Sequence, residues 1–194
     1  MSLRDHEWKR RYKSTEDKNA LLNSFFLPAL KESTVYLRGA GFFSSSMFDA
    51  IGGELGDFVE RGGKMRILAS VVISEKDREA IKLGLKQRDT VTEEELARII
   101  EEDFRPPLKS GSMMLTRLLE LERLEIKIGV KNPGMYHEKI GIFFDDDIDL
   151  DAKYDDLVGY DHLAFFGSVN EGVTAWQLSH ENIKVYPSWN EKRS

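Results

Sequence analysis

The chain has 194 residues, of which 41% are hydrophobic and 32% charged, with a formal net charge of −6. This composition is typical of a soluble globular protein that is long enough to bury one core. The absence of cysteine excludes disulfides, thiolate zinc sites and cysteine nucleophiles, and it favours a reducing, cytoplasmic environment. No run of 18 apolar residues predicts a membrane span, and the charged start lacks the apolar core of a signal peptide.

The first part of the chain predicts a strand–helix–strand unit that follows a charged segment, 1–19. Periodic apolar residues and turn signals favour a helix over 20–32, a strand over 34–43, a helix over 47–61 and a strand over 64–73. Two strands that are separated by one helix indicate parallel pairing through a right-handed crossover.

The rest of the chain predicts further helices and strands around an acidic insert, 145–161. Helices are expected over 74–86, 92–104, 108–124 and 174–178, and strands over 125–130, 136–144, 162–167 and 182–186. Ser74 and a Thr92–Glu95 capping box mark two of the helix starts, and residues 132–134 form a turn. The order of these elements predicts one α/β domain, 1–194, with a mixed, largely parallel β-sheet that is flanked by helices on both faces.

Two polar residues interrupt the apolar strand that is predicted over 136–144. His137 and Lys139 are two residues apart, so on a strand both side chains leave the same face. A histidine and a lysine are costly to bury on an apolar strand unless they have a partner or a function. Their joint presence favours a site that binds an anion beside a nucleophile.

A second polar pair follows the strand that is predicted over 162–167. Ser168 and Asn170 are again two residues apart, and their hydroxyl and amide groups suit a phosphoryl oxygen. Glu181 lies just before the final strand, where a carboxylate could hold an imidazole in one tautomer. These residues predict a phosphate-binding site, although Gly167-Ser168 also suits a tight turn.

His-x-Lys, Gly-Ser-x-Asn and a glutamate before the last strand together resemble the phospholipase D superfamily. The likeness is greatest to its nuclease and restriction-enzyme branch and to related domains attached to helicases, and it covers about residues 20–190. Glu181 follows Asn170 by 11 residues, a spacing similar to that of small nucleases in this superfamily. The sequence departs from the family pattern where Phe144 occupies the position of an aspartate, and Asp145, one residue later, is left out of the site.

This resemblance implies a role for each residue. His137 would attack phosphorus and form a phosphohistidine, while Glu181 orients the imidazole ring. Lys139, Asn170 and Ser168 would bind the phosphoryl oxygens, with no metal and no cofactor. A second histidine must protonate the leaving oxygen. Because the chain has only one His-x-Lys, the resemblance implies a homodimer in which two His137 side chains share one phosphate site.

Three other charged features allow two interpretations each. The aspartate-rich stretch 145–151 suggests calcium, but it lacks the glycine and the glutamate of an EF-hand loop, which favours a solvated loop. The basic cluster near the start suits either a solvated face or contacts to a nucleic-acid backbone. Its members are Lys9, Arg10, Arg11 and Lys13. Glu171 either caps the following helix or touches the site.

The leading hypothesis is a metal-independent endonuclease domain that acts on DNA rather than RNA, as part of a longer protein such as a restriction enzyme or a helicase. The acidic charge fits, because another domain would then supply most of the affinity for nucleic acid. A non-catalytic dimerisation module that binds a phosphate backbone is the main alternative. A phospholipid transferase is a second alternative. The sequence has no amphipathic membrane anchor, which makes this alternative and any other membrane contact less favoured.

Overall fold

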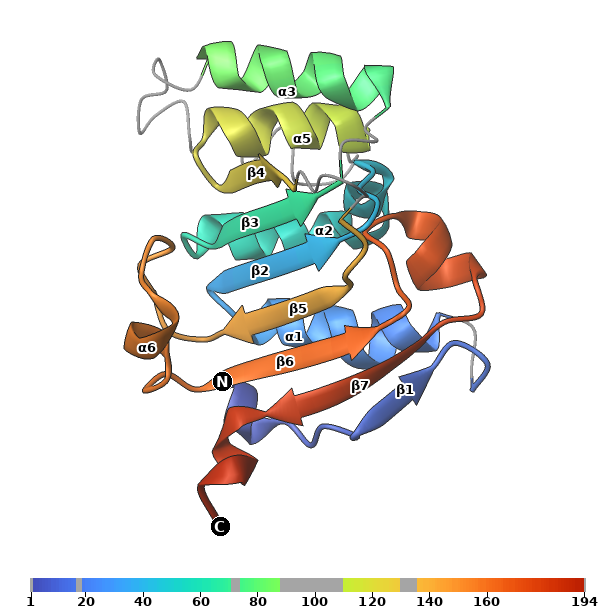
Figure 1. Ribbon diagram of the computed structural model, residues 1–194. Coiled ribbons are helices and arrows are strands. Elements are labelled where there is room, and N and C mark those ends of the chain that lie inside the picture. The colour runs from blue at the N-terminus through green and yellow to red at the C-terminus, as the bar shows by residue number, and fades with distance from the viewer. Residues whose placement is uncertain (1, 17–18, 71–73, 88–109, 130–135, 194) are drawn as a thin grey trace.

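The computed structural model describes residues 2–16, 19–70, 74–87, 110–129 and 136–193, which are built around one sheet (Figure 1). The sheet has seven strands in the order β1-β7-β6-β5-β2-β3-β4. The strands are β1 (Arg11–Lys13), β2 (Val35–Ala40), β3 (Lys64–Ala69), β4 (Leu124–Ile128), β5 (Ile140–Phe144), β6 (His162–Gly167) and β7 (Asn182–Pro187). The predicted α/β class with a mixed sheet is therefore confirmed.

Parallel pairing is confined to one half of the sheet. β2 pairs in parallel with β3, and β3 with β4, as the predicted strand–helix–strand unit requires. By contrast, β5 is antiparallel to β2 and β6, and β7 is antiparallel to β6 and β1. The expectation of a largely parallel sheet is thus wrong, because the connections after β5 carry no long crossover helix.

One face of the sheet carries the main hydrophobic core. The elements η2 (Leu22–Phe26), α1 (Leu27–Glu32) and α2 (Ser46–Glu60) lie behind the sheet in Figure 1. Phe25 packs edge-to-face on Phe143 and Phe165, which project from β5 and β6. Trp176, in the π-helical turn η4 (Thr174–Leu178), is fully buried in the same core. This core fixes the strands whose ends form the candidate site.

The opposite face is covered by the acidic insert rather than by a helix layer. Ile148 is buried against Val35 and Phe144, and the only helix of the insert is the short α6 (Tyr154–Leu157) among the described residues. The insert is also tied to the sheet by an ion pair between Arg66 and Asp151 at 2.8 Å. The expectation of helices on both faces is therefore corrected, because apolar residues within the insert close part of this face. Most of the insert is exposed, as expected for a solvated loop.

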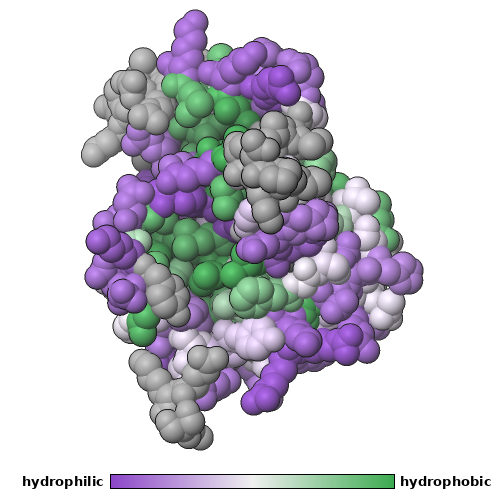
Figure 2. Space-filling model, in the orientation of Figure 1, coloured by the Kyte–Doolittle hydropathy of each residue, from purple (hydrophilic) through white to green (hydrophobic). Residues whose placement is uncertain are grey.

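An apolar hollow of about 210 Å³ remains open on this second face. Its apolar lining consists of Leu37, Leu68, Ile140, Ile142 and Leu150. Figure 2 shows hydrophobic residues at the centre of this view with hydrophilic residues around them. The two faces therefore differ: one is a closed core, and the other is partly exposed.

Two further helices pack against each other beside β4. They are α3 (Glu75–Gln87) and α5 (Gly111–Glu120), at the top of Figure 1. The predicted cap is confirmed, since the Ser74 hydroxyl accepts a hydrogen bond from the Asp77 amide at 3.1 Å. Gly84 permits the close approach, because a Cβ there would lie 2.6 Å from the carbonyl oxygen of Thr116. The helix expected over 92–104 and the turn at 132–134 lie outside the described residues.

Several boundaries differ from the predicted ones. The helix expected over 108–124 ends at Glu120, because β4 begins at Leu124. The strand expected over 136–144 begins at Ile140. β1 was not predicted at all, and it forms from the basic cluster by pairing with β7 at the edge of the sheet. Short 3-10 turns, η1 (Leu3–Asp5) and η5 (Ser188–Arg193), lie near the two ends.

Within the described residues, no helix combines the length and the apolar character that crossing a membrane requires.

Candidate active site

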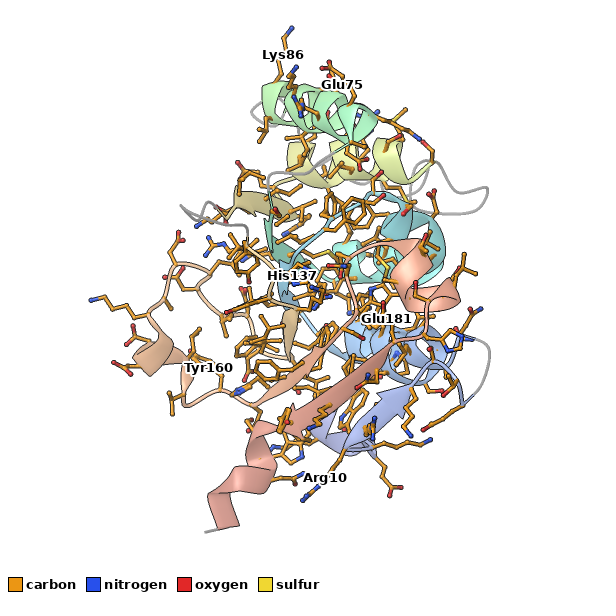
Figure 3. The ribbon with its side chains drawn as sticks, turned by 45° about the vertical axis from the view of Figure 1, so that its right-hand side comes forward. Arg10, Glu75, Lys86, His137, Tyr160 and Glu181 are labelled. Carbon is orange, nitrogen blue, oxygen red and sulfur yellow. The ribbon has the colours of Figure 1, made fainter. Side chains whose placement is uncertain are left out.

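The five predicted site residues lie beside strand ends at one end of the sheet. β5 and β7 begin where β6 ends, because these three neighbouring strands are antiparallel. His137 and Lys139 precede β5, and Ser168 and Asn170 follow β6. Glu181 immediately precedes β7. Figure 3 shows His137 and Glu181 at this end of the strands.

His137 and Lys139 contact each other directly. The Lys139 ammonium donates to the carbonyl oxygen of His137 at 2.9 Å, and its nitrogen lies 3.2 Å from each ring nitrogen of His137. Both residues precede the strand, so the premise that they project from one face of a strand is wrong. Their proximity instead comes from the turn of the ammonium back toward the histidine backbone. The His137 side chain is exposed, so a substrate can reach it.

The small residues at the end of β2 make room for the site. A Cβ on Gly41 would lie 3.2 Å from Cδ2 of His137 and 3.4 Å from Oδ1 of Asn170. A Cβ on Gly39 would collide with the hydroxyl of Tyr136. His137 and Asn170 therefore approach the same point on the backbone, although their segments are far apart in sequence. The close approach of these side chains is the steric reason for the glycines at this strand end.

Asn170 is held by the backbone of the same strand end. Its Oδ1 accepts a hydrogen bond from the amide of Phe42 at 3.1 Å. This contact assigns the carbonyl side of the Asn170 amide to the protein. The NH₂ side, which can only donate hydrogen bonds, is directed away from that contact.

Ser168 has a contact that favours a structural role. Its backbone amide donates to the carbonyl oxygen of Asn182 at 3.2 Å, and its hydroxyl accepts from the Asn182 amide at 3.3 Å. Ser168 thus extends the pairing of β6 with β7 by one residue. A Cβ on Gly167 would collide with the Asn182 carbonyl, so the glycine of Gly-Ser is required sterically. The Ser168 side chain is nevertheless exposed beside the other site residues.

Glu181 is fixed through its backbone. Its amide donates to the Ser14 hydroxyl at 2.8 Å, and its carbonyl oxygen accepts from the Ser14 amide at 3.0 Å. Its carboxylate acts on Lys139 through charge. Among the described residues, the Glu181 carboxylate forms no hydrogen bond with the His137 ring. The expected orienting role of Glu181 therefore stays a prediction.

Opposing electrostatic effects act on the pKa of the Lys139 ammonium. Partial burial lowers its pKa from the ordinary value, and the positive charge of Arg38 lowers the pKa further. The negative charge of Glu181 opposes this shift. The net pKa is lowered, so Lys139 loses its proton more readily than a free lysine does.

A buried ion pair adjoins the site, and it was not among the predicted site features. Arg38, in β2, donates to a carboxylate oxygen of Glu171 at 2.8 Å, and both side chains are almost completely buried. Arg38 also donates to the carbonyl oxygen of Val169. The Tyr36 hydroxyl lies 3.3 Å from the same carboxylate. Burial raises the pKa of Tyr36 well above its ordinary value, with the charge of Glu171 adding to the shift, so Tyr36 stays a neutral donor.

This ion pair answers the question about Glu171. The Glu171 side chain contacts Arg38 and Tyr36 instead of capping η4 or entering the site. Its backbone joins the segment after β2, since its amide donates to Phe42 and its carbonyl oxygen accepts from Ser44. The signal in the sequence was Arg38 itself, an arginine within an otherwise apolar strand, which requires a buried partner. Asn170, one residue before Glu171, is thereby anchored on two sides.

A group of three or more histidine, aspartate or glutamate side chains that could hold a metal ion does not occur among the described residues.

Comparisons with known proteins give distant structural likenesses. No family model and no curated protein matches the chain. Among solved structures, it is similar to NucT from Helicobacter pylori, with 12% identity over 94% of this chain and 86% of that one, and a TM-score of 0.49. It is also similar to Nuc from Salmonella typhimurium, described as a phospholipase D family member, with 14% identity over 94% and 88% and a TM-score of 0.46.

Yeast tyrosyl-DNA phosphodiesterase 1 is similar over 81% of this chain but only 27% of its own length, with 13% identity and a TM-score of 0.41. All three likenesses are distant, so the role of each site residue depends on the geometry of this chain.

Proposed function

We propose that this chain is a metal-independent phosphodiesterase that cleaves DNA through a phosphohistidine on His137. The observation that carries this proposal is the convergence of His137 and Asn170 beside Gly41 at one end of the sheet, with the Lys139 ammonium in contact with His137. A nucleophilic ring, a cation and an amide donor are the groups that an anionic phosphodiester requires.

The proposed reaction has two steps. A ring nitrogen of His137 attacks phosphorus, and the bond between phosphorus and the leaving oxygen breaks while a general acid protonates that oxygen. Water then attacks phosphorus, the bond between phosphorus and the His137 nitrogen breaks, and the same acid, now deprotonated, accepts a proton from the water. Lys139 and the NH₂ group of Asn170 stabilise the charge that develops on the non-bridging oxygens. The Ser168 hydroxyl accepts from the Asn182 amide, so its own proton can still be donated to a phosphoryl oxygen.

The general acid is proposed to be His137 of a second copy of the chain. His162 begins β6 and therefore lies at the opposite end of that strand from Ser168. His6 packs against the ring of Trp8 near the start of the chain. His180 is exposed next to Glu181, and it is the one other histidine of the described chain that adjoins the site in sequence. An isologous homodimer would bring two His137 rings to a shared phosphate.

Hydrolysis of a bis-aryl phosphodiester in the presence of EDTA tests the proposed activity. The wild type should release the aryl alcohol, and His137→Ala should show only the background rate. His180→Ala serves as the matched control and should retain activity if the acid comes from a second His137. Equal rates for the wild type and His137→Ala would refute the proposal.

Light scattering after size exclusion tests the shared site separately. A dimer is expected at micromolar concentration, and mixing inactive His137→Ala with wild type should lower the activity per wild-type chain. A monomer that retains full activity would contradict the shared site while leaving the phosphodiesterase itself intact.

A binding module without catalytic activity is the second candidate. Two observations favour it: the Lys139 ammonium lies against both ring nitrogens of His137, and the Glu181 carboxylate is not hydrogen-bonded to that ring. A module of this kind would bind the phosphate backbone but leave the diester intact in the EDTA assay. Association with a helicase or with the DNA-reading part of a restriction enzyme fits either candidate.

A further inference from the structure

The face of the sheet that lies opposite the main core exposes two aromatic rings beyond the acidic insert. Phe166 in β6 is 48% exposed and Tyr186 in β7 is 44% exposed. Their ring centroids lie 5.7 Å apart in an edge-to-face arrangement. Neither ring belongs to the hydrophobic core, whereas their neighbours in sequence, Phe165 and Val185, do. Alternation along the strands therefore places both rings on the face away from the helices.

Basic side chains adjoin these rings on the neighbouring strands. Lys184 pairs directly with Phe166 across β6 and β7, and Arg11 pairs directly with Lys184 across β7 and β1. Lys13 is paired in the same way with Asn182. Within the described chain, none of these three cations forms an ion pair. Figure 2 shows hydrophilic residues beside residues of intermediate and apolar hydropathy on this lower part of the face.

This arrangement is unusual for the chain as a whole. The formal net charge is −6, and many of its cations, such as Arg4 and Arg66, are paired with aspartates. A groove of about 470 Å³ lies beside the rings, and Arg10, Arg11 and Lys184 contribute to its lining. Unpaired positive charge in an acidic protein locally favours an anionic partner.

The aromatic and basic residues lead toward the candidate site. Along β6, Phe166 is followed two residues later by Ser168, and along β7, Lys184 is preceded two residues earlier by Asn182. Ser168 and Asn182 are hydrogen-bonded to each other at the strand ends. Because each residue of a strand advances about 3.3 Å, the distance from Tyr186 to Asn182 is roughly 13 Å.

We propose that Phe166, Tyr186, Lys184 and Arg11 form a binding surface for single-stranded nucleic acid, which leads the strand to His137. Exposed rings stack on unpaired bases, and flanking cations bind the phosphates between them. A duplex offers only its backbone to such a surface, because its bases are already stacked on each other. This inference rests on the proposed phosphodiesterase function and specifies its substrate as an unpaired strand.

Fluorescence anisotropy with labelled oligothymidine tests the surface in the inactive His137→Ala protein with EDTA. The double change Phe166→Ala/Tyr186→Ala should weaken binding by about tenfold or more, because each stacked ring contributes substantially to affinity. Tyr160→Ala is the matched control, since Tyr160 is 40% exposed but lies in the acidic insert (Figure 3). Unchanged affinity of the double variant, at an unchanged unfolding midpoint, would overturn the proposal.

A second pair of variants tests the cations through salt dependence. Arg11→Gln/Lys184→Gln should reduce the slope of log affinity against log salt concentration by about 1.4, since each single-strand phosphate contact contributes about 0.7. Lys86→Gln, on the distant α3, should leave the slope unchanged (Figure 3). Equal affinity for a single strand and for a duplex of the same length would also contradict the proposal.

The two proposals can fail independently. Hydrolysis of the small bis-aryl diester by the wild type tests the phosphodiesterase proposal alone, because that substrate is too small to span the surface. If the wild type itself does not hydrolyse the diester, the phosphodiesterase proposal fails, and the binding measurements still decide whether the surface exists.

Discussion

Two charged pairs meet at the same end of the sheet, and they differ in their access to water. Arg38 and Glu171 are almost completely buried and bind each other at 2.8 Å. His137 is exposed and Lys139 is partly exposed, and the Lys139 ammonium contacts both the backbone and the ring of His137. The first pair connects two backbone segments, and the second presents reactive groups. Substitutions should therefore separate stability from activity.

The largest change in stability is expected from Glu171→Ala. This substitution leaves the Arg38 charge buried without its carboxylate, which should cost about 3–5 kcal/mol of unfolding free energy. Urea denaturation measures the loss, and Glu138→Ala, an exposed carboxylate beside His137, is the matched control with an effect within about 0.5 kcal/mol. A loss for Glu171→Ala that is no larger than the control would mean that the buried pair does not support the site.

Lys139→Ala should instead lower the activity without lowering the stability. Removing one donor to the developing phosphoryl charge should lower kcat by about 10²–10³. The free energy of unfolding should change little, because Lys139 is partly exposed and its substitution leaves no buried group without a partner. Steady-state hydrolysis and urea denaturation of the same preparation measure both quantities. If Lys139→Ala lost enough stability to account for its loss of activity, the buried pair and the exposed pair would not have separate roles.

A smaller effect is expected in the pH dependence. Since burial and Arg38 lower the pKa of Lys139, activity that needs the ammonium is lost as pH rises through this lowered value. Lys139→Arg should keep its charge to higher pH, because the guanidinium pKa is above about 12. The alkaline limb of the pH–rate profile of Lys139→Arg should therefore lie at higher pH than that of the wild type, even if its maximal rate is lower. Identical alkaline limbs would assign the titration to another group.

The fold could be predicted from the sequence only in part. The core strands and helices were predictable, because their apolar periodicity is strong and they pack together behind the sheet. β1 was not, since the basic segment Arg11–Lys13 becomes a strand only through its pairing with β7. The insert 145–161 was taken as solvated from its aspartates, although Ile148 within it is buried against the sheet. Edge pairing and tertiary burial outweighed local composition in both cases.

The site was predictable in its residue types but not in its support. His137, Lys139 and Asn170 follow a spaced pattern that local sequence displays. The contact of Glu171 with Arg38 joins residues 133 positions apart, so only the folded chain reveals it. The position of Lys139 against the His137 ring also required the structure, because the strand begins after both residues.

A crystal structure of the chain grown with inorganic phosphate tests the central claim most directly. The account predicts an anion in contact with a ring nitrogen of His137, the ammonium of Lys139 and the NH₂ group of Asn170, with a second His137 on its far side. Phosphate bound only at other surface cations, with these three groups left without an anion, would contradict the account.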